Sequence, residues 1–121
     1  MNHLRISDIR AIKEEVLSSL HCALPGSVVS YDGERRTVDV QPGIRGKDGT
    51  PMPLLQGVPV FFMARDDFVP QEGDRCLVIF ADRCIDEWLE TGEPSVPGSN
   101  RKHDLSDGFA CLNTISWIKS I

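Results

Sequence analysis

The chain has 121 residues, of which 40% are hydrophobic and 26% charged, and its formal net charge at pH 7 is −5. A chain of this length forms one domain and buries roughly two thirds of the surface that it exposes when unfolded, so its core needs no covalent crosslinks. The acidic balance and the scattered positive residues argue against a surface that tracks nucleic-acid phosphates. No apolar run approaches the ~20 residues that span a bilayer, and the N-terminus lacks the apolar core of a signal peptide, which predicts synthesis in the cytoplasm.

The first predicted element is an amphipathic helix from Ile6 to Leu20. Ser7 or Asp8 is its expected N-cap, and Pro25-Gly26 prevents its continuation. Its apolar stripe consists of Ile9, Ile12, Val16, Leu17 and Leu20, with Arg10, Lys13, Glu14 and Glu15 expected on the opposite face. Such a helix either docks onto a partner or lies on its own domain, and both alternatives are open at this point.

From Gly26 the pattern becomes that of strands. The runs GSVVSY and TVDVQP flank Asp32-Gly33, which is a strong hairpin signal. Pro42 to Pro53 is rich in glycine and proline and is expected to be a loop. Leu54 to Met63 predicts a further strand, in which Pro59 must lie at an edge or a bulge.

The longest apolar run, Cys76 to Ala81, predicts a strand that is covered on both faces. Cys76, Val78 and Phe80 would point to one side of it, and Leu77, Ile79 and Ala81 to the other. A short helix should follow, because Ile85, Trp88 and Leu89 recur at helical spacing, Asp82 can cap the helix and Gly92 can end it. After a loop over EPSVPGSNRK, a last strand should place Phe109 and Cys111 on one face and Ala110 and Leu112 on the other.

Five strands with a short helix before the last one predict a mainly β fold, a small closed barrel. The predicted organisation is an N-terminal helix over residues 1–22, a barrel domain over residues 23–112 and a short apolar tail over residues 113–121. The tail carries Ile115, Trp117, Ile118 and Ile121, for which a small filled barrel has no room. Together with the helix stripe, the tail favours self-association, since soluble chains seldom leave such patches uncovered.

The most polar cluster is His103-Asp104-Leu105-Ser106-Asp107. A metal site or a hydrolase needs further groups from separate elements, and no spacing recruits His3 or His21. A turn into the last strand, set up by Ser106 and Asp107 bonding nearby backbone, explains the cluster better. There is no phosphate-binding loop and no nucleophile elbow. We therefore expect no catalytic residues and no cofactor.

The four cysteines are Cys22, Cys76, Cys84 and Cys111. They lie far apart, with no CxxC pair and no closely following histidine, so the spacing of a zinc site is missing. Buried, reduced thiols without an intrachain disulfide are expected.

Three stretches, GVPVFF at 57–62, GDRCLVIFADRCIDEWLETG at 73–92 and RKHDLSDGFA at 101–110, resemble in combination the N-terminal OB-fold domain of phage baseplate central-spike proteins. The resemblance extends back through PGSVVSYDGERRTVDVQP and covers about Cys22 to Leu112. The positions that match the family pattern are Val58, Pro59, Val60, Gly73, Asp74, Phe80, Ile85, Trp88, His103, Asp104, Leu105, Ser106 and Asp107.

The resemblance implies an OB-like barrel, a homotrimer on the tail axis and a structural role at the centre of the baseplate of a phage or a phage-derived contractile injection system. The chain would link the tail tube to the piercing tip and help to penetrate the host envelope. The implied partners are other baseplate, hub or tail-tube proteins, a separate needle-tip chain and, transiently, the host envelope. The implied location is the virion tail baseplate, after synthesis in the host cytoplasm.

Spike proteins of this family continue into a β-helix needle in which His-x-His repeats hold iron, whereas this chain stops at Ile121 without such a repeat. An iron tip is therefore not implied, and the chain corresponds to a barrel alone, a shortened spike or a hub part with a separate needle. A trimer would triplicate each cysteine, so a metal on the threefold axis is a minor alternative to plain burial.

The alternative function is that of an OB-fold domain that binds single-stranded nucleic acid. Tyr31, Phe61, Phe62 and Phe68 could stack on bases. The acidic balance supplies no basic groove for the phosphates, so no nucleic-acid partner is expected. An enzyme is the third alternative and rests on His103 and Asp104 alone.

Overall fold

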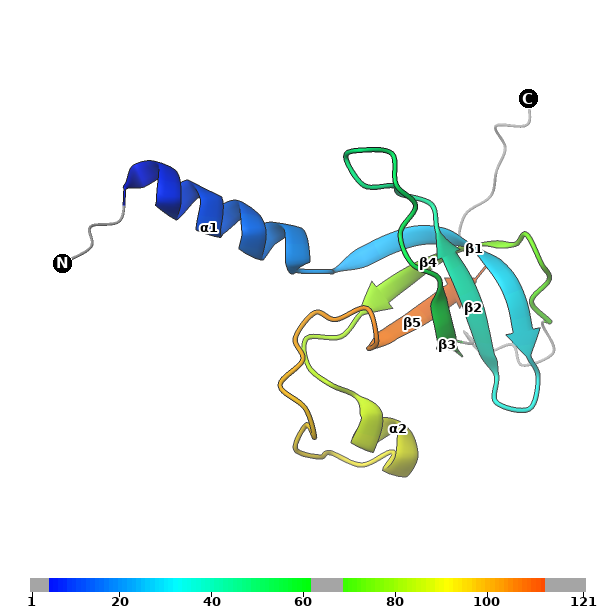
Figure 1. The fold of residues 1–121 in the computed structure, drawn as a ribbon. Helices are drawn as coiled ribbons and strands as arrows, with labels where there is room; N and C mark the ends of the chain where they lie inside the picture. Colours follow the sequence, from blue (N-terminus) through cyan, green and yellow to red (C-terminus); the bar gives the residue numbers. More distant parts are fainter. Residues whose placement is uncertain (1–4, 62–68, 113–121) are drawn as a thin grey trace.

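The computed structural model describes residues 5–61 and 69–112 and contains a five-stranded barrel with two helices. The elements are α1 (Ile6–Ser19), β1 (Ala23–Asp32), β2 (Thr37–Pro42), β3 (Leu55–Phe61), β4 (Arg75–Phe80), α2 (Asp86–Thr91) and β5 (Gly108–Leu112). The strands close in the order β1-β2-β3-β5-β4, with β1 pairing back to β4 (Figure 1). The pairing is antiparallel throughout except between β3 and β5. This mainly β fold confirms the predicted barrel, its leading helix and the short helix before the last strand.

The barrel closes through β1, which is long enough to pair with two neighbours. Its first half pairs with β4 and its second half with β2, and Gly26 has a partner in both, Cys76 and Pro42. A Cβ atom on Gly26 would lie 2.7 Å from the backbone oxygen of Gln41 and 2.7 Å from Val40 Cγ1. Glycine is required here because the strands approach too closely for a side chain.

The core lies inside the barrel and follows the alternation of the strands. It consists of Val28, Val38, Val40, Leu55, Val58, Cys76, Val78, Phe80 and Ala110, all of them buried. Cys76, Val78 and Phe80 share one side of β4 as predicted, and the structure shows that this side faces the barrel interior. The prediction that this strand is covered on both faces is wrong, because the barrel interior takes only alternate side chains and the outward-facing Ile79 is 46% exposed.

Pro59 lies next to a bulge in β3. The register between β2 and β3 shifts between Val38 and Val40, and Gly57 adopts a φ of 64° opposite Asp39, whose Oδ1 accepts the Gly57 N–H at 3.0 Å. Pro59 follows two residues later, immediately before pairing with β5 begins at Val60. Its missing N–H is tolerated in this position.

Helix α1 projects away from the barrel (Figure 1), and none of its residues is buried. The alternative in which it lies on its own domain is therefore wrong, and docking onto a partner stays a prediction. The helix begins at Ile6 as predicted, but its N-cap is Arg5, not Ser7 or Asp8. Asp8 is at the third helical position, where its side chain accepts the Arg5 N–H at 3.1 Å. No helix in the described part of the chain is long and apolar enough to cross a bilayer.

The observed helix also corrects the predicted distribution of charge on α1. Residues four apart share a face, so Lys13 lies between Ile9 and Leu17, and Arg10 lies one turn from Ile6. Lys13 therefore lies within the apolar stripe and Arg10 at its edge, while Glu14 and Glu15 lie on the opposite face.

Helix α2 begins at Asp86 with Ile85 at the N-cap, so the predicted cap at Asp82 is wrong. The start of the helix is set by a tertiary contact, because the Ile85 N–H donates to Asp107 Oδ1 at 3.2 Å across a long segment of chain. The predicted end is confirmed: Gly92 has a φ of 72°, and its N–H donates to Trp88 O at 2.7 Å.

Candidate functional site

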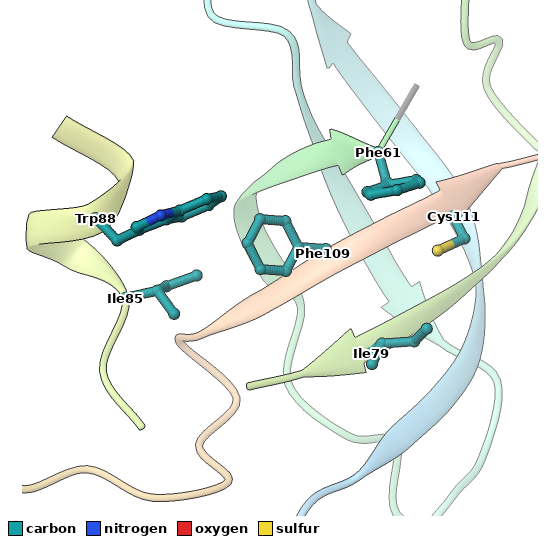
Figure 2. A pocket seen from close by; sticks show the side chains of 6 residues that line it. All are labelled: Phe61, Ile79, Ile85, Trp88, Phe109 and Cys111. Carbon is teal, nitrogen blue, oxygen red and sulfur yellow. The ribbon is translucent and has the colours of Figure 1, made fainter. Parts of the chain in front are cut away.

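An apolar groove of about 410 Å³ lies between α2 and the outer face of β3, β4 and β5 (Figure 2). Ile85 and Trp88 form the wall on the α2 side, and β5 runs through the middle of the groove. The lining residues are Phe61, Ile79, Ile85, Trp88, Phe109 and Cys111. Small-molecule sites combine such walls with a few polar groups that orient the ligand. The surface that the six lining side chains present is apolar, so the groove is suited to an apolar protein segment.

Two aromatic rings, one from α2 and one from β5, contact each other in the groove. The rings of Trp88 and Phe109 meet edge to face, with centroids 6.2 Å apart and an interplanar angle of 80°. Phe61, Ile79 and Trp88 are nevertheless all exposed. The groove is therefore an exposed apolar surface, the kind of surface on which proteins commonly bind partners.

The wall formed by α2 is tied to the barrel by the guanidinium of Arg101. Its Nη2 donates to Asp107 Oδ1 at 2.9 Å and to Asp86 Oδ2 at 3.1 Å, and its Nε donates to Asp107 Oδ2 at 3.0 Å. Asp107 is fully buried at the start of β5, and Asp86 begins α2. These hydrogen bonds raise the pKa of Arg101, so the guanidinium stays charged throughout the accessible pH range.

Three potential metal-ligating groups come together at the same place among the described residues. The ligating atoms of Cys84, Asp86 and Asp107 all lie within 4.8 Å of one another. Arg101 Nη2 already donates to all three, with Cys84 Sγ at 3.0 Å. The guanidinium occupies the position that a metal ion would need, so the cluster is a structural ion pair.

The His103 to Asp107 segment forms a turn between the α2 loop and β5. Asp104 Oδ1 accepts the Ser106 N–H at 2.8 Å, and Asp104 O accepts the Asp107 N–H at 3.0 Å. Hydrogen bonds from the backbone and the side chain of Ser106 lower the pKa of the Asp104 carboxyl. The structure thus supports the interpretation of this segment as a turn. The side chain that bonds the backbone of the turn is that of Asp104, not those of Ser106 and Asp107 as predicted.

His103 links this turn to the start of β1. Its backbone has a φ of 47°, its N–H donates to Asp82 O at 3.2 Å and its carbonyl accepts the His21 N–H at 3.1 Å. Its ring Nδ1 lies 3.3 Å from His21 O, and its Nε2 lies 3.7 Å from Asp82 Oδ1. These contacts join elements far apart in the sequence and do not assemble a nucleophile beside the imidazole.

A comparison with protein-family models matches residues 24–113 to the phage protein Gp138 N-terminal domain. The chain belongs to this family. The match covers the barrel and the groove, and it supports a phage structural protein. A search of curated proteins returns no significant match.

In this Gp138-type barrel, the residues carried by the spike resemblance occupy four places, one of which is the turn from His103 to Asp107 described above. Val58 and Phe80 are in the core. Gly73 and Asp74 form the turn into β4, where the Gly73 N–H donates to Val28 O at 2.8 Å and the Val28 N–H donates to Asp74 O at 2.7 Å. Ile85 and Trp88 line the groove. The functional roles of these positions remain predictions.

The predicted oligomer interface on the C-terminal tail lies outside the described residues. Its candidate residues are Ile115, Trp117, Ile118 and Ile121. Of the rings considered for stacking, Tyr31 packs against the core and Phe61 lines the groove, whereas Phe62 and Phe68 also lie outside the described residues. The described rings therefore do not form one platform along a strand face.

Sequence reasoning missed both the groove and the Arg101 ion pair. A signal for the groove exists, because Phe61, Ile79 and Phe109 are large apolar residues at outward positions of their strands. The pairing of Arg101 with Asp107 has no local signal, since a spacing of six residues in a loop corresponds to no regular element.

The cysteines of the Gp138-type barrel are all free thiols in different environments. Cys76 and Cys84 are buried as expected and Cys111 is half-buried, but Cys22 is exposed because it lies in the linker before β1. Burial, together with the nearby Cys111 and Asp74, raises the pKa of Cys76 to about 11. Burial also raises the pKa of Cys111.

Native protein at pH 8 should react with a thiol reagent fastest at Cys22, because the thiolate is the reactive form and the exposed thiol is accessible. Cys76 should react only on unfolding. The Cys22→Ser variant should lose the fast phase, and the denatured protein without reductant should yield four thiols per chain. A fast phase that survives in Cys22→Ser would contradict this order.

Proposed function

We propose that the chain is the central spike or hub module of the baseplate of a phage or a phage-derived contractile injection system. The observation that carries this proposal is the family match over residues 24–113, which spans the barrel. The resemblance of the stretches at 57–62, 73–92 and 101–110 to spike OB-fold domains supports the proposal of a role on the tail axis. In this position, the chain would join the tail tube to the piercing tip and help to penetrate the host envelope.

The proposed role is mechanical and non-catalytic. A closed barrel has no free sheet edge, and the Arg101 ion pair fastens its longest described loop, so the module suits the transmission of force from sheath contraction. The groove and α1 provide attachment surfaces for neighbours. We propose other baseplate, hub or tail-tube proteins as these neighbours, with a separate needle-tip chain at the distal end.

The location is tested on assembled particles. Antibodies against the chain should label the distal end of the tail in electron micrographs of purified virions, after synthesis of the chain in the host cytoplasm. Labelling of the capsid alone, or failure to find the chain in purified virions by mass spectrometry, would refute the baseplate role.

The chain should be a homotrimer in solution, because α1 and the apolar tail need cover and the proposed place on the tail axis demands threefold symmetry. Light scattering coupled to size exclusion should give three chains per particle at micromolar concentration. A chain ending at Leu112 tests the tail: dissociation would place the interface on the C-terminal tail, which carries Trp117 and Ile118. A dimer would argue against the spike role. A stable monomer would show that the apolar surfaces do not require association.

No useful nucleic-acid binding is expected, because phosphate neutralisation supplies most non-specific affinity and the net charge of the chain is −5. Titration of a labelled single-stranded oligonucleotide at physiological salt should show nothing tighter than about 10⁻⁴ M. Micromolar binding with a steep salt dependence would instead favour the single-stranded nucleic-acid-binding alternative.

A further inference from the structure

Each chain exposes two apolar surfaces that match in chemistry. One is the α1 stripe, formed by Ile9, Ile12, Val16, Leu17 and Leu20, each more than 40% exposed. The other is the groove between α2 and β3, β4 and β5. The barrel contains its own buried core without either surface. Within residues 5–61 and 69–112, both surfaces are exposed and open to a partner.

The stripe does not reach the groove of its own chain, because the linker between α1 and β1 is short and held in place. Leu20, His21 and Cys22 connect the two elements. The His21 N–H donates to His103 O at 3.1 Å, and Cys22 O accepts the Phe80 N–H at 2.9 Å. The His21 ring also meets Phe80 edge to face, with centroids 6.0 Å apart. These contacts direct α1 outward as an arm (Figure 1).

We propose that α1 of one copy lies in the groove of a second copy of the chain. An amphipathic helix with its apolar face in an apolar groove is a common mode of recognition. The helix has 14 residues, which at about 1.5 Å per residue gives an arm of about 21 Å. A copy of the chain supplies one helix and one groove, so each surface finds one partner.

The charges around the two surfaces are complementary. Lys13 lies within the stripe of α1 and Arg10 lies at its edge. The α2 wall carries Asp86, Glu87 and Glu90 and no basic residue. Arg101 pairs with Asp86 but is also balanced by Asp107, so the wall keeps its negative charge. Such charges fix the orientation of the helix, whereas the apolar contact supplies the affinity.

This contact is heterologous, because different surfaces of the two copies meet. Repetition of a heterologous contact closes into a ring when the rotation allows it. In a threefold ring, each of the three α1 helices would occupy the groove of the next copy, in agreement with the proposed trimer. The inference concerns only how copies associate and does not depend on a place in the baseplate.

Two single variants test the contact from its two sides. Val16→Glu places a charge in the stripe, and Ile79→Glu places one in the groove, both at exposed positions that leave the barrel core intact. Each variant alone should be a folded monomer by circular dichroism and light scattering. Val96→Glu is the matched control, because Val96 is 85% exposed in a loop outside both surfaces, and it should keep the parent oligomer.

A mixture of the two variants gives the decisive result. Val16→Glu retains an intact groove and Ile79→Glu an intact helix, so the mixture should form a one-to-one complex that cannot grow further. Folded variants that remain monomers when mixed would overturn the inference, as would single variants that keep the parent oligomer. In the latter case the oligomer itself stands, and so does the baseplate proposal.

Crosslinking gives a second, independent readout. In a Cys22→Ser background, Val16→Cys adds a thiol to the stripe, and the native Cys111 lies in the groove. A short bismaleimide should join the two positions between chains, and the additional Cys111→Ser change should abolish the product. Equal crosslinking with and without Cys111 would refute the helix-in-groove contact.

Discussion

Arg101→Ala should lower the free energy of unfolding by about 3–5 kcal/mol at pH 7, because it leaves the fully buried Asp107 carboxylate without its bidentate partner. The Ile85 N–H would remain as a hydrogen-bond donor to that carboxylate, and a single amide does not balance a buried charge. Urea unfolding measures the loss. A decrease below about 1 kcal/mol would show that the ion pair contributes no more than an exposed pair does.

Two further substitutions separate the charge of Arg101 from its shape. Arg101→Lys keeps the positive charge but loses the planar fork that spans both carboxylate oxygens, so its loss of stability should lie between those of the parent and the alanine variant. Lys102→Ala removes an exposed positive charge next to it in the chain and should change the stability by less than about 0.5 kcal/mol.

The alanine variant should also loosen the groove. Arg101 joins Asp86 at the start of α2 to Asp107 at the start of β5, so its removal frees one wall of the groove. Amide exchange in α2 should accelerate more than exchange in β4 under native conditions. Uniform acceleration in both elements would indicate global destabilisation without a particular role in holding α2.

Gly26→Val should lower the free energy of unfolding by about 3 kcal/mol, at the upper end of the range for overpacked positions. A Cβ atom at this position would lie 2.7 Å from Gln41 O, and a backbone oxygen in a paired strand cannot move without opening the contact between β1 and β2. The same strand also pairs with β4 at Gly26, so the strain falls where the barrel closes.

Gly33→Ala is the matched control for this prediction. Gly33 lies in the hairpin turn after β1, and an added Cβ would meet Tyr31 Cε2 at 3.7 Å, an ordinary van der Waals distance. Its stability should stay within about 0.5 kcal/mol of the parent. Equal losses in the two variants would show that the close approach at Gly26 is not what makes glycine necessary there.

The sequence by itself determined the elements of the barrel, because their signals are local. Alternation put Cys76, Val78 and Phe80 on one side of β4, and Asp32-Gly33 and Gly92 marked the ends of elements through backbone preferences. The number of strands and the position of the short helix followed from the same signals. Each of these features depends on residues within a few positions of one another.

The tertiary structure alone decided which surfaces those elements leave free. Amphipathic spacing predicted α1 but not that its stripe would be exposed, which follows from the fixed linker at His21. The groove exists because β3, β4 and β5 become neighbours and α2 stands beside them, and α2 stands there because Asp107 and Arg101 hold its first turn. These contacts join residues far apart in the chain or across an irregular loop, where periodicity and propensity carry no information.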